Sequence, residues 1–280
     1  FDLSERFATL SELLESESPL HALRATAGRF IGSVQELLAN SASQPDSSRP
    51  YLLPPLDLQV IKAAGVTFAA SMIERVIEEQ AGGDAARAEA VRATVSAVIG
   101  DNLRAVKPGS EQAMALKALL IEQGMWSQYL EVGIGPDAEV FTKAPVLAAV
   151  GSGSVIGVHP GSQWNNPEPE VVLAVDSRGR IHGATLGNDV NLRDFEGRSA
   201  LLLGKAKDSN ASCSIGPFDR LFDDGFGIDD VRNAELDLVI EGPEGYRLEG
   251  HSAMSQISRD PLELVRQTLS EHQYPDGFAL

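Results

Sequence analysis

The sequence predicts an α+β fold, with a mainly helical part over residues 1–135 and a β-rich part over residues 136–280. Helical spacing of apolar residues indicates the first part, and short apolar runs that fit strands indicate the second. Glycines become frequent from about residue 135, and the turn-like segments "DSRGR" and "EGPEG" separate neighbouring runs. We therefore expect antiparallel hairpins in the second part.

The expected elements follow from these patterns in chain order. Two helices are expected between residues 1 and 40, and a strand-like segment leads up to residue 68. Further helices are expected over four segments, the last of which has a proline in its first turn: residues 69–80, 84–103, 110–125 and 259–272. Strands are expected over four others: residues 170–175, 181–186, 236–241 and 245–250.

The composition excludes some classes of partner. The chain has 23 basic and 40 acidic residues, for a net charge of -17. Such a balance argues against binding to nucleic acid or to anionic membrane surfaces, which rest on positive charge. The single cysteine, Cys213, allows no intrachain disulfide, and no apolar run reaches the roughly 18 residues of a membrane span. We therefore expect a cytoplasmic protein. Both chain ends look cut, because the sequence opens on Phe1 and stops inside "GFAL".

Two glutamates stand at the start of an apparently buried strand. In "NNPEPEVVLAV", Glu168 and Glu170 flank a proline and precede five apolar residues. Side chains two apart on a strand share a face, about 7 Å apart, so the two carboxylates repel each other unless a cation lies between them. Hard oxygen ligands suit magnesium, manganese or calcium. The alternative is a solvated strand edge that carries two surface glutamates.

A third carboxylate follows after a second apolar run. Asp189 lies in "GNDVNLRDFEG", nineteen residues after Glu170. A hairpin between the two runs returns the chain to its starting point and places Asp189 beside the glutamates. An Asn-Asp pair alone is usually a turn, but three carboxylates on one hairpin predict a metal site.

Three motifs in this part carry a resemblance. The segments "EPEVVLAV", "LGNDVNLRD" and "GKAKDSNASCSIGPF" resemble the catalytic core of the fumarylacetoacetate hydrolase superfamily. That family has an E-x-E pair, an N-D-x-S-x-R-D segment and a lysine shortly before a G-P turn, and Asn191 here replaces the serine. The resemblance implies a mixed β-roll over residues 136–280 that binds magnesium, with manganese as an alternative. By position it implies three metal ligands, a catalytic lysine and a substrate-side arginine: Glu168, Glu170, Asp189, Lys205 and Arg193.

An upstream segment resembles the lid of the same family. The stretch "KAAGVTFAASMIERV" opens the expected lid, residues 62–80, and is similar to the family pattern G-L-N-Y-x-x-H-x-x-E. Phe68 holds the aromatic place on the substrate side, and Glu74 holds the glutamate place. Ser71 replaces the histidine that helps to activate water in the hydrolases, so hydrolysis is disfavoured. Ser71 and Glu74 can still move a proton and assist a leaving hydroxyl; the alternative is an ordinary polar helix face.

Similarity along the whole chain points to one branch of the superfamily. Together with the core motifs, "WSQYLEVGIGPDAE", "FTKAP" and "HQYPDGFAL" resemble a branch that dehydrates 2-keto-3-deoxy-D-pentonates, such as the xylonate or arabinonate. This implies a hydro-lyase that forms 2-oxoglutarate semialdehyde through a metal-stabilised enolate, usually as a homodimer or higher oligomer. Lys143 and Glu196 would lie on the substrate side, although a surface lysine and a plain helix residue are the alternatives. The resemblance also implies that the last strands of the roll are missing from this chain.

Other readings remain open from the sequence. A hydrolase of 2,4-dioxo acids would cleave a carbon–carbon bond, and a 2-oxo acid decarboxylase would release carbon dioxide from oxaloacetate. A non-catalytic binding module could keep the metal site for stability, although such a site needs only the three carboxylates. Turnover that a chelator abolishes would separate an enzyme from a binding module.

Overall fold

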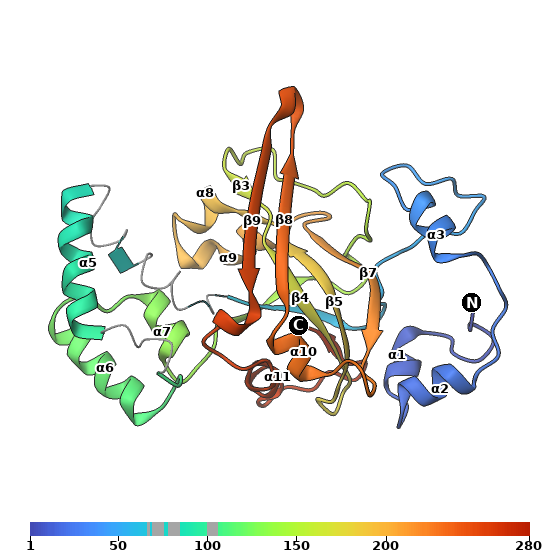
Figure 1. Cartoon of the computed structure of the whole chain (residues 1–280), viewed down its shortest axis with the longest axis horizontal. Coiled ribbons are helices and arrows are strands. Elements are labelled where there is room, and N and C mark those ends of the chain that lie inside the picture. The colour runs from blue at the N-terminus through green and yellow to red at the C-terminus, as the bar shows by residue number, and fades with distance from the viewer. Residues whose placement is uncertain (66–67, 69–75, 78–84, 100–105) are drawn as a thin grey trace. The chain divides into compact units, whose positions relative to one another are not determined.

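The computed structural model describes residues 1–65, 68, 76–77, 85–99 and 106–280 (Figure 1). The chain divides into two compact units. Unit 1 consists of residues 1–63, 141–231 and 271–280, and unit 2 consists of residues 64–140 and 232–270. Each unit therefore combines segments that are far apart in the sequence.

The boundary expected at residue 135 does not separate these units. Strand β1 (Val60–Ala64) pairs in parallel with β10 (Phe278–Ala279), so that Val60 lies opposite Phe278. This pairing places residues 60 and 61 beside the C-terminal strand within unit 1, while residues 232–270 belong to unit 2. Local composition cannot reveal such a division, because it depends on pairing between distant segments.

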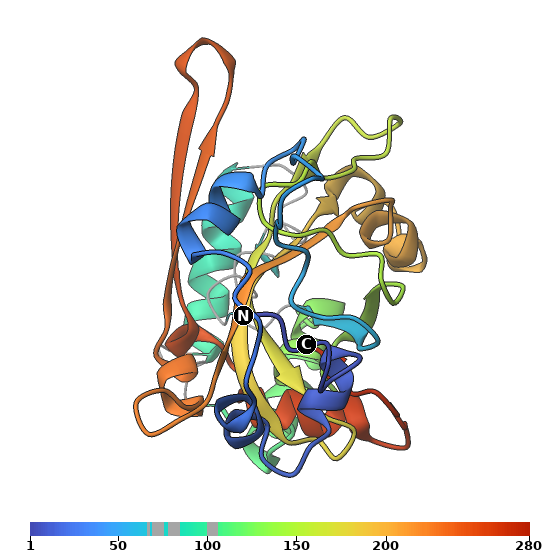
Figure 2. The same ribbon diagram turned by 90° about the vertical axis from the view of Figure 1, so that its right-hand side faces the viewer.

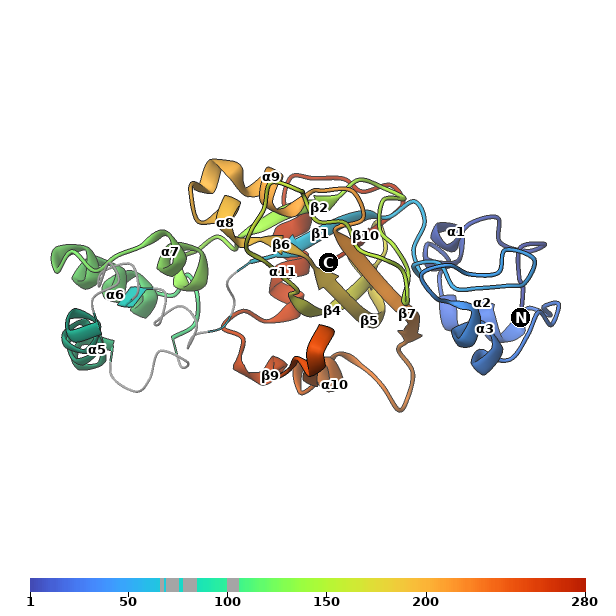
Figure 3. The ribbon, with the colours of Figure 1, turned by 90° about the horizontal axis from the view of Figure 1, so that it is seen from above.

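A six-stranded sheet forms the centre of unit 1 (Figure 3). Its strands follow the order β2-β1-β10-β4-β5-β7, and β10, β4, β5 and β7 are successively antiparallel. The remaining strands of this sheet are β2 (Val140–Ala144), β4 (Pro169–Val175), β5 (Ile181–Asp189) and β7 (Cys213–Leu221). The mixed helix and sheet architecture predicted from the sequence is confirmed.

The hairpin predicted between the two central runs is present. Strands β4 and β5 pair with Glu170 opposite Gly187 and Val172 opposite Thr185. In the turn, Asp176 N donates to Arg180 O at 3.0 Å, and Gly179 adopts a positive φ of 79°. The side chain of Asp176 is fully buried, and burial alone would raise its pKa, but hydrogen bonds from His182 and Arg180 lower the pKa to about 2. The turn is therefore fixed by its own polar contacts.

A cluster of buried residues packs against the six-stranded sheet. The buried residues there are Ile61, Ala144, Val172, Cys213, Ile215 and Ala279. Burial also raises the pKa of the Cys213 thiol to about 12, so the thiol stays protonated at neutral pH. Cys213 is thus a small core residue, and the packed layer joins residues of β1, β2, β4, β7 and β10.

Short elements surround the open end of the hairpin. Strands β3 (Asn165–Asn166) and β6 (Asn191–Leu192) pair antiparallel, with Asn166 opposite Asn191. Helix α8 (Arg193–Glu196), the 3-10 turn η2 (Ala200–Leu202) and helix α9 (Leu203–Lys207) follow. Leu192, Phe195 and Ala206 form a small buried cluster that joins β6, α8 and α9. The segments on both sides of the hairpin mouth are therefore anchored to each other.

The N-terminal segment forms three short helices rather than the expected two. These are α1 (Leu10–Leu14), α2 (Pro19–Ala25) and α3 (Val34–Asn40). Proline occupies the first turn of α2, and Ser33 with Glu36 forms a capping box at the start of α3. The cap starts a new helix at Ser33 and divides the pattern that the apolar spacing alone suggested was continuous.

Unit 2 contains helices and one hairpin. Its helices are α5 (Ala85–Ile99), α6 (Glu111–Glu122), α7 (Gln128–Ile134) and α11 (Pro261–Leu269). Strands β8 (Glu235–Glu241) and β9 (Arg247–Ala253) form a long two-stranded ribbon (Figure 2), and α10 (Ile228–Arg232) precedes it. The 3-10 turns η3 (Pro243–Gly245) and η4 (Met254–Gln256) flank β9. Expected elements over 84–103, 110–125, 236–241, 245–250 and 259–272 are thus confirmed; residues 69–80 lie almost entirely outside the described residues.

Unit 2 contains an apolar core and a fully buried arginine. Leu120, Leu130 and Ile134 pack with Met125 and Val76. Arg259 is fully buried and donates to the carbonyl oxygens of residues 132, 135 and 137. None of the described helices is both long and apolar enough to cross a bilayer.

Candidate metal centre

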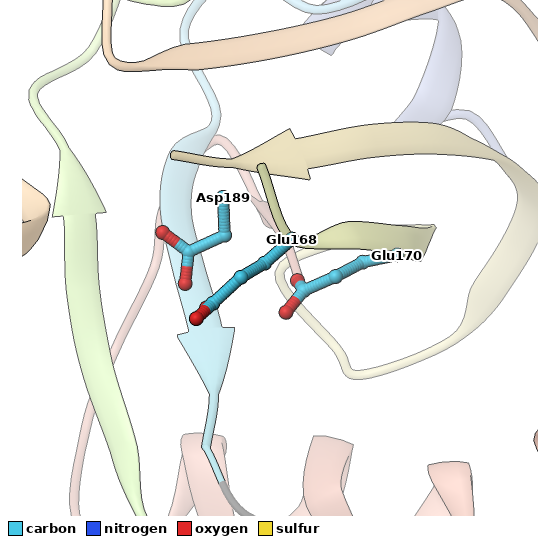
Figure 4. A group of neighbouring side chains, drawn as sticks. All are labelled: Glu168, Glu170 and Asp189. Atoms are coloured by element: carbon cyan, nitrogen blue, oxygen red, sulfur yellow. The ribbon is translucent and has the colours of Figure 1, made fainter. Parts of the chain in front are cut away.

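The three carboxylates predicted as metal ligands lie together in unit 1 (Figure 4). Glu168 precedes β4, Glu170 lies in β4 and Asp189 ends β5. One oxygen atom from each residue lies within 4.8 Å of the others. The convergence of their side chains matches the hairpin geometry expected from the sequence.

Backbone pairing at the hairpin mouth produces this convergence. Asp189 N donates to Glu168 O at 3.0 Å, and Glu168 N donates to Asn188 Oδ1 at 3.0 Å. Glu168 and Asp189 thus face each other across the open end of the β4–β5 hairpin, and Glu170 lies two residues after Glu168 on the same face. Opposite Glu170, a Cβ added to Gly187 would come within 2.5 Å of Val172 Cγ2, so a larger residue at this position would force Val172 to shift.

Lys207 binds two of the three carboxylates. Its Nζ lies 2.5 Å from Glu168 Oε2 and 2.8 Å from Asp189 Oδ2, and the side chain is buried. Burial alone would lower the lysine pKa, but attraction to Asp189 and Glu168 outweighs this effect and raises the pKa. Lys207 is therefore a fixed positive charge at neutral pH.

Lys143 forms a buried ion pair with Asp189. Its Nζ lies 2.9 Å from Asp189 Oδ1 and donates to the carbonyl oxygens of Val190, at 3.0 Å, and Lys207. The residue is 1% exposed, so its ammonium group faces the interior. Lys143, predicted on the substrate side, contacts Asp189 and also lines the recess next to the carboxylates.

The side chain of Glu170 has a strongly raised pKa. Burial is the largest cause of the shift, and the like charges of Asp189 and Glu168 add to it, so that the pKa of Glu170 rises from 4.5 to about 8. Without a cation, the site therefore favours a neutral Glu170. The pair of repelling glutamates noted in the sequence is resolved in this state by a proton on one of them.

The donor set fits a divalent cation with oxygen ligands. Asp189 Oδ1 is buried, and no described residue gives it a hydrogen bond with acceptable geometry, although Lys143 Nζ lies nearby as an ion-pair partner. Three ionised carboxylates also exceed the two lysine charges by one. Carboxylate oxygens are the ligands that magnesium and manganese prefer. Glu168, Glu170 and Asp189 are therefore a candidate site for either ion.

The lysine predicted for this site, Lys205, lies elsewhere. It is exposed, and its Nζ lies 5.4 Å from the centre of the Phe195 ring. Lys205 and Lys207 are two residues apart on helix α9, and side chains with this spacing do not share a helix face. Both lysines stand shortly before the Gly-Pro turn in the sequence, so the motif alone could not distinguish them.

Arg193 and Glu196 form an ion pair beside the cluster. Arg193 Nη1 lies 2.9 Å from Glu196 Oε2, and that oxygen also accepts a hydrogen bond from Asn191 Nδ2 at 2.7 Å. The same Asn191 amide donates to Glu168 Oε1 at 3.1 Å. The two predicted substrate-side residues are thus connected to a candidate metal ligand through one amide.

The structure tests little of the predicted lid. Ser71 and Glu74 lie outside the described residues. Phe68 forms a bridge with Ile257 within unit 2, and residues 62–64 of the segment belong to strand β1. The beginning of the expected lid is therefore part of the sheet.

A further lysine lines the recess next to the carboxylates. The recess in unit 1 is bordered by Lys62, Lys143, Glu170, Asn188, Asp189 and Cys213, among others. Lys62 Nζ donates to Thr142 Oγ1 at 2.9 Å, and burial lowers its pKa. Lys62 could not be singled out from the sequence, because its place in this recess depends on the pairing of β1 within the sheet.

Comparisons with known proteins agree with this picture. The chain is 34% identical over 155 residues to a probable 2-keto-3-deoxyxylonate dehydratase of Haloferax volcanii. The matched segment covers 55% of this chain and 52% of that protein. It is 31% identical over 142 residues to 2-dehydro-3-deoxy-D-arabinonate dehydratase of Saccharolobus solfataricus, spanning 51% and 47%. The chain is a homologue of these dehydratases. The resemblance to their branch of the superfamily is therefore confirmed, although no family model matches the chain.

Solved structures support the same relationship. A 2-keto-3-deoxy-D-arabinonate dehydratase complexed with magnesium and 2,5-dioxopentanoate is 29% identical, with a TM-score of 0.52 over 55% of this chain and 54% of that one. Another crystal form of 2-keto-3-deoxyarabinonate dehydratase, 22% identical, matches the fold over 95% of this chain and 77% of that one, with a TM-score of 0.64. The chain spans about half the length of the curated relatives it matches.

Metal binding is expected to depend on pH because Glu170 must lose its proton. Its pKa of about 8 in the metal-free protein means that roughly one site in ten is ionised at pH 7. The apparent Kd for Mn²⁺ should therefore fall about tenfold per pH unit up to about pH 8 and then level off. Calorimetry in buffers of different ionisation enthalpy should detect close to one released proton per ion at pH 7.

The same pKa predicts how the metal-free protein responds to pH. A carboxyl whose pKa is higher in the folded state than in the unfolded state favours folding at low pH and loses this contribution as pH rises from about 4.5 to 8. Thermal denaturation should thus show a falling Tm over this range, and saturating Mn²⁺ should restore it. A Kd that does not change between about pH 6 and 8 would contradict the assignment of Glu170 as a ligand.

Proposed function

We propose that this chain is a magnesium-dependent dehydratase of 2-keto-3-deoxy-D-pentonates, a carbon–oxygen lyase that forms 2-oxoglutarate semialdehyde. The observation that carries this proposal is the convergence of Glu168, Glu170 and Asp189 at one hairpin mouth. Homology to two proteins named as dehydratases of such sugar acids supports it. The magnesium relative was solved with 2,5-dioxopentanoate, which is another name for the proposed product.

The three carboxylates would hold the ion, and manganese is an alternative to magnesium. A bound divalent cation polarises the keto group of a 2-oxo acid and makes the C3 protons more acidic. Dehydration then requires that a proton leave C3 and that the C4 hydroxyl leave as water. The chain must provide a group that accepts the first proton and a group that protonates the leaving hydroxyl.

Lys207 takes the part expected of Lys205. Its raised pKa excludes it as a base at neutral pH, so it contributes a positive charge where negative charge develops on the substrate oxygen. Lys143 neutralises and orients Asp189 from the interior. Lys62, which lines the same recess, is our candidate for binding the substrate carboxylate.

The remaining roles follow the motif positions. Glu74 and Ser71 are our candidates for the proton transfers at C3 and at the leaving hydroxyl. Phe68, Arg193 and Glu196 are candidates for contacts to the sugar acid chain, since the Arg193–Glu196 pair lies one amide away from Glu168. We also propose a cytoplasmic homodimer or higher oligomer that acts on this small-molecule substrate.

A coupled assay tests this function. The protein is incubated with 2-keto-3-deoxy-D-xylonate or the D-arabinonate epimer and Mg²⁺, and the semialdehyde is followed by a dehydrogenase that oxidises it. We expect turnover that a chelator abolishes and that added Mg²⁺ or Mn²⁺ restores. Turnover that survives the chelator, or cleavage of a 2,4-dioxo acid or decarboxylation of oxaloacetate in its place, would contradict the proposal.

A further inference from the structure

Two asparagine amides converge on one oxygen of the candidate metal ligand Glu168. Asn191 Nδ2 donates to Glu168 Oε1 at 3.1 Å, and Asn166 Nδ2 donates to the same atom at 3.2 Å. The other oxygen, Oε2, contacts Lys207. The carboxylate is therefore held from two sides, and its plane is fixed.

The two asparagines reach Glu168 because their strands are paired. Asn166 in β3 lies opposite Asn191 in β6, directly beside the hairpin mouth. Asn191 is fully buried, and its amide also donates to Glu196 Oε2 at 2.7 Å. Both hydrogens of this amide thus serve carboxylates, one at the ion site and one in the pair with Arg193.

The orientation of both amides is set by the carboxylate. Asn166 Oδ1 and Asn191 Oδ1 are buried and have no hydrogen-bond donor among the described residues. Rotating either amide by half a turn would point its oxygen at Glu168 Oε1, where two acceptors repel. Each side chain therefore leaves its own oxygen unsatisfied in order to donate to Glu168, which a purely structural amide would not do.

We propose that Asn191, assisted by Asn166, is a positioning residue that orients Glu168 for the divalent ion and couples this ligand to Glu196 and Arg193. This inference rests on the proposed metal-dependent function. The superfamily pattern has serine at this position, and a serine hydroxyl has only one hydrogen to donate. Only a side chain with two donors can bridge Glu168 and Glu196, so the coupling is a property of the asparagine in this chain.

Binding of Mn²⁺ to metal-free protein tests this role without any substrate. Free Mn²⁺ is measured by electron paramagnetic resonance, and Mg²⁺ affinity by competition. Asn191→Leu should weaken Mn²⁺ binding by about 10- to 100-fold, as is typical when a group that orients a ligand is lost. Asn191→Ser should fall between Asn191→Leu and the wild type. Asn166→Leu should have a smaller effect, because that amide also contacts Pro167 O at 3.4 Å and does not reach Glu196.

A matched variant controls for the loss of a buried amide. Asn40 is 7% exposed, and its Nδ2 donates to the carbonyl oxygens of residues 46, 49 and 50 in the N-terminal segment of unit 1. Asn40→Leu should lower Tm but leave the Kd for Mn²⁺ unchanged. Should Asn191→Leu fail to fold, Asn191→Ser and Asn166→Leu carry the same comparison.

The outcomes separate this inference from the proposed function. A wild-type chain that binds no Mn²⁺ would overturn both. A wild-type chain that binds Mn²⁺, with Asn191 variants that bind it within about twofold, would overturn the positioning role alone. An equal loss in Asn40→Leu would also overturn it, because the effect would then come from general destabilisation.

Discussion

Replacing Glu170 by alanine is expected to abolish chelator-sensitive turnover and to weaken Mn²⁺ binding by more than about 100-fold, beyond the loss typical for an outer-shell change. Glu170 is one of three carboxylates whose oxygens lie within 4.8 Å, and two carboxylates next to two lysines no longer carry a net negative charge. The measurements are the coupled dehydratase assay and Mn²⁺ titration by electron paramagnetic resonance.

The thermal stability of metal-free Glu170→Ala, unlike its metal affinity, should not fall. Burial, with the like charges of Asp189 and Glu168, raises the pKa of Glu170 to about 8, so above this pH an ionised Glu170 destabilises the metal-free fold. The metal-free Glu170→Ala protein should therefore have an unchanged or higher Tm at about pH 8.5 while it loses metal binding. The exposed Glu5→Ala serves as control and should alter neither property. Retained Mn²⁺ affinity in Glu170→Ala would show that the ion, if bound, does not use this carboxylate.

The two lysines of helix α9 should differ sharply when each is replaced by methionine. Lys207→Met should lower kcat by about 100- to 1000-fold, the loss seen when one group that stabilises developing negative charge is removed. Lys205→Met should keep kcat within about threefold, because Lys205 is exposed and its ammonium group lies over the Phe195 ring rather than on a carboxylate of the cluster. The two substitutions are chemically identical and two residues apart, so each controls for the other.

Metal affinity distinguishes the two possible causes of a loss in Lys207→Met. Removal of a positive charge that contacts Glu168 and Asp189 should leave Mn²⁺ binding unchanged or make it tighter. Lost turnover with retained Mn²⁺ binding would thus place Lys207 in the reaction. Equal losses of kcat in both variants, or full activity in Lys207→Met, would contradict the assignment.

The carboxylate cluster was predictable from sequence because it depends on local geometry. Glu168 and Glu170 share a strand face through their spacing, and the "DSRGR" turn fixes the hairpin that brings Asp189 back. Asn191 was visible only as a departure from the family pattern. Its contacts with Glu168 and Glu196 depend on the β3–β6 pairing, which two-residue strands do not announce in the sequence.

Other features could not be predicted because they depend on distant pairing or on helix phase. The choice between Lys205 and Lys207 is set by how α9 packs Ala206 against Leu192 and Phe195. Strand β7 was missed because its Gly-Pro pair suggested a turn, although proline is tolerated in this edge strand. The parallel pairing of β1 with β10 links two segments that are far apart in the sequence and could not be predicted from either segment alone.

Anomalous diffraction from crystals of this protein grown with Mn²⁺ tests the central claim most directly. The account predicts one strong manganese peak bound by oxygens of Glu168, Glu170 and Asp189, with metal–oxygen distances of about 2.0–2.3 Å. The peak should disappear in Glu170→Ala crystals. A map with no peak among these three carboxylates at saturating Mn²⁺, or a peak only at other residues, would contradict the account.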